Sequence, residues 1–145
     1  MNPEIRETPF EKRLCGRSKT VLQNQKAVEA MIAAMDETWK IVRENSIPNG
    51  GINHIVYNSQ RVFAGVEIAG SVDAAWGLEQ VDLVIPRSIY YRHVGAYDLL
   101  GQAYTRLNAE IAAKGLATTG LSLEIYGHWS EDTTQLVTEI LIGVK

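Results

Sequence analysis

The sequence has almost no cysteine and no long hydrophobic run, and both absences exclude whole classes of protein. Among its 145 residues there is a single cysteine, Cys15, which excludes an internal disulfide and a zinc site built from cysteines. No apolar run reaches 18 residues, and the charged segment Met1–Arg17 lacks the apolar stretch of a signal peptide. The histidines and carboxylates show no metal-ligand spacing. We therefore expect a cytoplasmic protein that uses no metal, no cofactor and no membrane.

Positive charge is scarce as well. The chain has 14 Lys and Arg residues against 17 Asp and Glu residues, a formal net charge of −3. A protein that binds the phosphate backbone of DNA or RNA needs a basic face, so we expect no direct binding of nucleic acid. The length is that of one ordinary domain, which can bury roughly 68 to 70% of the surface exposed by its unfolded chain. We predict a single domain over residues 1–145.

What the sequence does contain is an internal repeat. Thr20–Asn58 aligns with Ile89–Gly127 without a gap, at a constant offset of 69 residues. Both copies place apolar residues at the i, i+3, i+4 spacing of one helical face, and this agreement makes the repeat credible. Four positions are identical in the two copies: Ala27 and Ala96, Ala34 and Ala103, Gly51 and Gly120, and Tyr57 and Tyr126. We place repeat 1 at about 13–69, a connector at 70–79 and repeat 2 at about 80–145.

Each copy is predicted to fold as strand, helix, strand, strand. Residues of the first copy indicate, in order, a strand at Thr20–Gln23, a helix from Lys26 to about Asn45 with Asn24 as its cap, and strands at Ile52–Asn58 and Arg61–Ala69. Those of the second indicate a strand in two sections, Gln80–Ile85 and Ile89–Val94, divided by Pro86, then a helix from Gly95 to Lys114, and strands at Leu121–Trp129 and Leu136–Val144. The predicted fold class is α+β, with one mixed or antiparallel curved sheet, two long helices on one of its faces and a cleft between pseudo-twofold repeats.

Alternation along the strands predicts which side chains meet the helices. We expect the aliphatic sets to do so, namely Leu121, Leu123 and Ile125 of one strand and Ile140, Ile142 and Val144 of another. Three polar or aromatic residues, Glu124, Tyr126 and Glu139, would then lie on the opposite face, joined by Tyr57 and Glu67 of the first copy.

This second face has two interpretations, and the pattern alone leaves both open. It is either an ordinary exposed sheet face or a concave cleft with carboxylates at its bottom. A desolvated carboxylate needs a partner, and a lipophilic organic cation would supply the charge while its flat body stacks on rings. The candidate rings are Tyr57, Trp76, Tyr90, Tyr91, Tyr126 and Trp129. Tyr90 and Tyr91 point to opposite faces of a strand, so at most one of them lines such a cleft.

Several segments together resemble a known family. They are Trp76–Glu79, Ile85-Pro86, Tyr91–Leu99, Leu123–Tyr126 and Thr138–Val144. In order and spacing they resemble the GyrI-like or AraC-type effector-binding domains, although Lys19–Gln25 has neither the His nor the Gly of the family's first-copy pattern. The resemblance implies a duplicated fold that binds small, often cationic and hydrophobic, molecules between its repeats, with an acid at the floor of the cleft. Glu139 matches the acidic position of the closing strand, and Glu124 is a second acid nearby.

The leading functional hypothesis is a stand-alone module that binds a cationic, amphipathic or aromatic compound, to sequester it or to sense it for a separate regulator. No helix-turn-helix segment fits before residue 20. The resemblance also implies two alternatives. One is a hydrolase of small reactive electrophiles that uses Glu139 or Glu124 with Tyr126; the other is a protein that inhibits or protects DNA gyrase by direct contact. The sequence also leaves open whether the protein forms a homodimer. The candidate ligand-binding residues are Glu139, Glu124, Tyr126, Trp76, Tyr91, Tyr57, Trp129 and Glu67.

Overall fold

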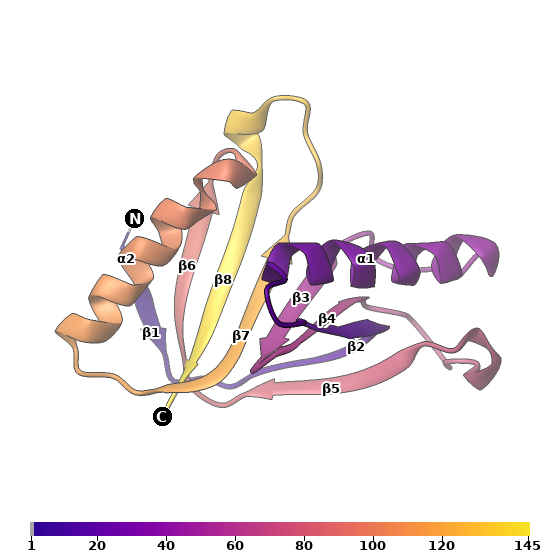
Figure 1. Cartoon of the computed structure of the whole chain (residues 1–145), viewed down its shortest axis with the longest axis horizontal. Helices are drawn as coiled ribbons and strands as arrows, with labels where there is room; N and C mark the ends of the chain where they lie inside the picture. Colours follow the sequence, from indigo (N-terminus) through magenta and orange to yellow (C-terminus); the bar gives the residue numbers. More distant parts are fainter. Residues whose placement is uncertain (1) are drawn as a thin grey trace.

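The chain folds into one sheet with two long helices packed against it (Figure 1). The computed structural model describes residues 2–145. Its strands are β1 (Glu4–Arg6), β2 (Phe10–Thr20), β3 (Asn53–Asn58), β4 (Arg61–Val66), β5 (Glu79–Ile85), β6 (Ser88–Val94), β7 (Thr118–Tyr126) and β8 (Val137–Val144). Its helices are α1 (Ala27–Glu44) and α2 (Leu100–Ala113), with the 3-10 turns η1 (Ala74–Trp76), η2 (Tyr97–Leu99) and η3 (Thr133–Gln135).

The sheet topology shows the duplication. The strand order is β1-β6-β8-β7-β3-β4-β2-β5, and every neighbouring pair is antiparallel. The units β2-α1-β3-β4 and β6-α2-β7-β8 therefore take equivalent places about the central β7–β3 pair, with β5 and β1 as equivalent outer strands. In Figure 1 the two halves diverge from this centre, each with its own helix. The predicted α+β fold with two helices on one face of a curved antiparallel sheet is confirmed.

The sheet is strongly curled, which the connection from β5 to β6 demonstrates. These strands are six positions apart in the strand order, a separation of roughly 29 Å in a flat sheet. Only Pro86 and Arg87 lie between them, and that link spans at most about 11 Å. The outer strands must therefore bend toward each other, away from the helices, and the sheet gains an enclosed inner face.

Both faces of the sheet are consequently buried. On the helix face, α1 covers a cluster that includes Ile55 and Ala64, while α2 covers one that includes Ile89 and Ile140. The inner face holds its own apolar core, formed by Leu14, Val56, Phe63, Leu83, Ile85, Tyr90, Leu123 and Leu141. No helix within residues 2–145 has the length and apolar character needed to cross a membrane.

Two local predictions for the first copy are wrong. Its first strand is β2, which ends at Thr20 rather than covering Thr20–Gln23; one half of β2 pairs with β5 and the other half with β4. Gly16 lies where these pairings overlap, and a Cβ there would come within 1.9 Å of the Ala64 carbonyl oxygen, so only glycine fits. Asn24 does not cap α1 but has a positive φ of 66°, and Lys26 occupies the cap position without a side-chain bond. In the second copy, the two predicted sections on either side of Pro86 are separate strands, β5 and β6.

The predicted assignment of faces is wrong for β7 and also for Tyr57 of β3, which packs on the helix side with Ile55. Glu124 lies directly opposite Ile140 in β8, and Ile125 lies opposite Glu139. Cross-strand partners point to the same side of a sheet, so Glu124 shares the helix face with Ile140, whereas Glu139 is on the inner face. Leu121, Leu123 and Ile125 pack into the inner core rather than against the helices. The two glutamates thus lie on opposite faces.

Candidate functional site

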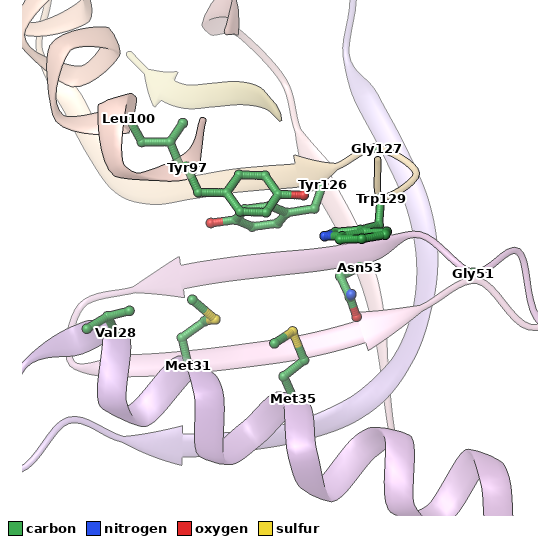
Figure 2. Close-up of a pocket in the computed structure, with 10 residues that line it drawn as sticks. All are labelled: Val28, Met31, Met35, Gly51, Asn53, Tyr97, Leu100, Tyr126, Gly127 and Trp129. Atoms are coloured by element: carbon green, nitrogen blue, oxygen red, sulfur yellow. The ribbon is translucent and has the colours of Figure 1, made fainter. Parts of the chain in front are cut away.

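A cleft of about 420 Å³ opens between the two repeats on the helix face. One wall comes from the N-terminal half of α1 and the other from η2 and the first turn of α2, with the end of β7 between them. Figure 2 shows the residues that line the cleft, from these elements, from the start of β3 and from the loops beside them: Val28, Met31, Met35, Asn53, Tyr97, Leu100, Tyr126 and Trp129, together with Gly51 and Gly127. The lining is mainly apolar and aromatic, as in many sites for small organic molecules.

Aromatic rings gather at one side of this cleft. The rings of Tyr97 and Tyr126 meet edge to face, with centroids 5.3 Å apart and planes at 79°. Trp129 comes from the loop after β7 and is 72% exposed, so its indole has a free surface beside the cleft. On the neighbouring wall, Asn53 is held by a hydrogen bond that the Trp39 Nε1–H donates to its Oδ1 over 2.7 Å. A flat ligand entering here would meet rings, methionine side chains and one fixed amide.

The two copies contribute equivalent positions. With the offset of 69, Val28 corresponds to Tyr97, Met31 to Leu100, Met35 to Tyr104 and Tyr57 to Tyr126. The spacing of three and four residues aligns the first three members of each copy along one face, on α1 in the first copy and on the continuous run of η2 and α2 in the second. The cleft is therefore a consequence of the duplication: each repeat presents the same helix face toward the pseudo-twofold axis.

Glu124 lies next to the cleft and is only 5% exposed. Its Oε1 accepts hydrogen bonds from the hydroxyls of Tyr57 at 3.2 Å and Tyr126 at 2.8 Å, and its Oε2 accepts one from the Tyr104 hydroxyl. Three phenols from β3, α2 and β7 thus surround one carboxylate. None of the ion pairs found among residues 2–145 involves Glu124. The carboxylate is hydrogen-bonded but receives no cationic partner from these pairs.

The electrostatics of the tyrosines follow from this arrangement. Burial raises the pKa of Tyr57, Tyr104 and Tyr126 well above the ordinary value of 10.0, and the neighbouring charge of Glu124 raises each pKa further. The phenols therefore remain protonated and act as hydrogen-bond donors to Glu124. The site therefore places a hydrogen-bonded carboxylate, which none of the ion pairs described for residues 2–145 includes, beside an apolar, aromatic opening.

The structure brings together half of the candidate residues. Tyr126 and Trp129 line the cleft, and Tyr57 and Glu124 form the cluster beside it. Trp76 instead packs near the C-terminal part of α1, with Val42, Ile47 and Val66. Tyr91 packs beneath α2.

Two acidic candidates lie across the sheet from the cleft. Glu139 accepts a 2.6 Å hydrogen bond from the Tyr90 hydroxyl, and Glu67 forms a 3.1 Å ion pair with Lys12. Both border a separate cavity on the inner face. Tyr90 and Tyr91 do point to opposite faces, as alternation predicts.

Three polar residues at or beside the cleft were not among the sequence candidates. Tyr97 and Asn53 line the cleft, and Tyr104 donates to Glu124. Two of them could have been found from the internal repeat. Tyr97 and Tyr104 are the equivalents of Val28 and Met35, which lie on a helix face that points to the pseudo-twofold axis.

Comparison with known proteins establishes the fold. No family model matches the sequence, and no curated protein matches it. Among solved structures, SAV2435 bound to tetraphenylphosphonium is 12% identical with a TM-score of 0.65, over 100% of this chain and 94% of that one. The EcmrR C-terminal domain is 16% identical with a TM-score of 0.67, over 99% and 97%. A hydrolase from Listeria innocua is 9% identical with a TM-score of 0.61, over 99% and 92%. At these identities the similarity shows a shared fold.

Proposed function

We propose that this protein is an effector-binding module of the GyrI-like type, which binds a lipophilic aromatic cation in the cleft between its repeats for sensing or sequestration. The observation that carries the proposal is Glu124, a nearly buried carboxylate held by three phenols beside an apolar, ring-lined opening. Support also comes from SAV2435, a protein of the same fold whose solved structure holds tetraphenylphosphonium.

Physical chemistry favours this class of ligand over others. A lipophilic cation loses little hydration on entering an apolar cleft, so its attraction to Glu124 is offset by a small desolvation cost. Contacts of its charge with the faces of Tyr97, Tyr126 or Trp129 contribute about 0.5 to 2 kcal/mol each. A neutral compound of the same shape would gain the apolar contacts but not the charge interaction. An anion would be repelled by Glu124.

Tetraphenylphosphonium and its neutral relative triphenylphosphine oxide separate these contributions. Trp129 lines the cleft and is exposed, so its fluorescence should report binding there. We expect saturable quenching by the cation and weak or no quenching by the neutral compound. Equal affinities for the two compounds would contradict the proposal.

Two glutamine variants then locate the charge that matters. Glu124→Gln should weaken binding of tetraphenylphosphonium by about 1 to 3 kcal/mol, or roughly five- to 150-fold, because it removes the charge next to the cleft. Glu139→Gln removes an equal charge across the sheet and should leave this binding within about twofold of the wild type. A larger loss in Glu139→Gln than in Glu124→Gln would show that the closing-strand glutamate is the cation partner after all.

A hydrolase is the second candidate, and the contact between Glu124 and Tyr104 favours it. A carboxylate next to three protonated phenols has both a general base and general acids within hydrogen-bonding distance, and one protein of this fold is described as a hydrolase. Mass analysis of small reactive electrophiles, such as strained-ring compounds, after incubation with the protein tests this activity. Product formation that is lost in Glu124→Gln would support the hydrolase hypothesis. If every compound is recovered unchanged, the hydrolase hypothesis fails and the binding module is retained.

A further inference from the structure

A second cavity, of about 400 Å³, opens on the inner face of the curled sheet, across the sheet from the cleft. Its walls come from β2, β3, β7 and β8 and from the end of β4. The residues that line it include Phe10, Lys12, His54, Glu67, Ile125 and Glu139. Gly127, where β7 ends, borders both cavities, but no other residue is shared. Nothing in the proposed function uses this second cavity.

His54 is the first sign that this cavity is built for a ligand. The side chain is 1% exposed, and its Nε2 is buried without a hydrogen-bond partner within residues 2–145. Its Nδ1 lies 3.1 Å from the Ile52 carbonyl oxygen, which can only accept, so Nδ1 carries the proton. Burial lowers the pKa of His54, which keeps the ring neutral near pH 7. Nε2 is therefore an unsatisfied acceptor, a state that folded proteins generally avoid.

The carboxylates add further acceptors. The Oε2 atom of Glu139 accepts a hydrogen bond from the Tyr90 hydroxyl. Arg92 lies opposite Glu139 on β6. None of the ion pairs found among residues 2–145 involves Glu139. Glu67 uses Oε1 to pair with Lys12 at 3.1 Å. With His54 neutral, one lysine and two glutamates leave the lining with one net negative charge. The cavity thus presents mainly acceptors and calls for a cation with N–H donors.

The chemistry of these acceptors narrows the choice of cation. No group of three His, Cys, Asp or Glu side chains in residues 2–145 is arranged to hold a metal ion. A planar guanidinium or amidinium group spreads its N–H donors in a fixed fork and pairs with a carboxylate through two parallel hydrogen bonds. We propose that this inner-face cavity is a second binding site, separate from the cleft, for a small molecule carrying a guanidinium or amidinium group, with Glu139 as its main charge partner.

Calorimetric titration of the whole chain with methylguanidinium and with benzamidinium tests the site. Tetramethylammonium is the control that has the charge but no N–H donor, and methylurea is the control that has planar N–H donors but no charge. We expect saturable binding of the first two compounds and at least about tenfold weaker binding of both controls. In nitrogen-15 NMR spectra of the histidine side chains, the chemical shift of His54 Nε2 should change when either of the first two compounds binds.

Three variants locate the binding. Glu139→Gln retains an acceptor for the Tyr90 hydroxyl but removes the charge, and should weaken benzamidinium at least about tenfold. Glu67→Gln should weaken it less, and serves as the test if Glu139→Gln fails to fold. Glu11→Gln removes the same charge from an exposed position on β2 outside the cavity, and should change nothing.

Competition separates this site from the cleft. Saturating tetraphenylphosphonium should leave methylguanidinium binding intact, because methylguanidinium has no aromatic body with which to occupy the cleft. Equal binding of either control compound, an equal loss in Glu11→Gln, an unchanged His54 resonance, or displacement of methylguanidinium by tetraphenylphosphonium would each overturn the second site.

Discussion

Removal of one hydroxyl from the Glu124 cluster should destabilise the fold while preserving the attraction of the cleft for cations. In Tyr104→Phe the carboxylate loses the donor to its Oε2 and retains the two donors to Oε1. A hydrogen bond to a charged group contributes about 1.5 to 3 kcal/mol. We therefore expect the free energy of unfolding to fall by about 1.5 to 3 kcal/mol, and Tm by roughly 4 to 10 °C for a domain of this size.

For the affinity of the cleft for a cation, we predict that Tyr104→Phe has the opposite effect. With fewer donors, Glu124 is less compensated by the protein, so a bound cation should stabilise it more than in the wild type. Tetraphenylphosphonium should bind to Tyr104→Phe at least as tightly as to the wild type, although the fold is weaker. Urea unfolding measures the first effect and fluorescence titration the second.

A double-mutant cycle assigns the cost to Glu124. In Glu124→Gln the acceptor is neutral, so the further change Tyr104→Phe should cost about 1 kcal/mol less than it does beside the carboxylate. Tyr97→Phe is the matched control, because its ring also lines the cleft but its hydroxyl does not bond Glu124. The electrostatic reasoning fails if Tyr97→Phe is as destabilising as Tyr104→Phe, or if the cycle shows no coupling.

Other predictions concern the rest of the fold. Burial lowers the pKa of His54 below its ordinary 6.5, so below that pH the unfolded chain binds a proton that the folded chain does not. Stability should therefore decrease as pH falls through this window, by up to about 1.4 kcal/mol per pH unit, and urea unfolding of His54→Gln should show a flatter dependence. Gly16→Ala should destabilise the sheet by about 1 to 3 kcal/mol or more, measured by thermal unfolding, because its Cβ would overlap the Ala64 carbonyl oxygen; a Tm equal to that of the wild type would contradict the close approach. Trp129→Leu should abolish most of the fluorescence quenching by tetraphenylphosphonium and weaken its affinity severalfold in calorimetry, whereas full quenching would place the ligand elsewhere.

The architecture could be predicted from the sequence because the internal repeat indicated the order of helices and strands. Apolar residues at helical spacing predicted α1 to within a residue or two at each end, and the turn after Asn58 predicted the β3–β4 hairpin. What it did not indicate was the strand β2, since Phe10–Thr20 mixes charged and apolar residues along a strand whose two halves pair with different partners. Its true extent is a property of the curled sheet, not of the local pattern.

The site was only partly predictable, and the reason is the second buried face. Alternation of side chains along a strand separates its two faces. It identifies the face covered by helices only when the other face is exposed to solvent. Here Leu123 is fully buried on the inner face and Ile140 is fully buried on the helix face. The aliphatic residues of β7 and β8 therefore belong to different layers, and Glu124 and Glu139 were wrongly assigned to one surface. Only the β7–β8 register separates them.

The register at the centre of the sheet also explains why the cleft has one acid and not two. Glu124 lies directly opposite Ile55 where β3 and β7 meet, and with the offset of 69 these two residues are equivalent positions of the repeat. A glutamate in both copies would place two carboxylates face to face in a buried site, which is destabilising. Because Ile55 is aliphatic, Glu124 alone lies near the axis, and the equivalent tyrosines Tyr57 and Tyr126 both donate to the same oxygen. The symmetry of the backbone thus positions paired donors around an acid that exists in only one copy, and one carboxylate matches the single positive charge of the ligand that we propose.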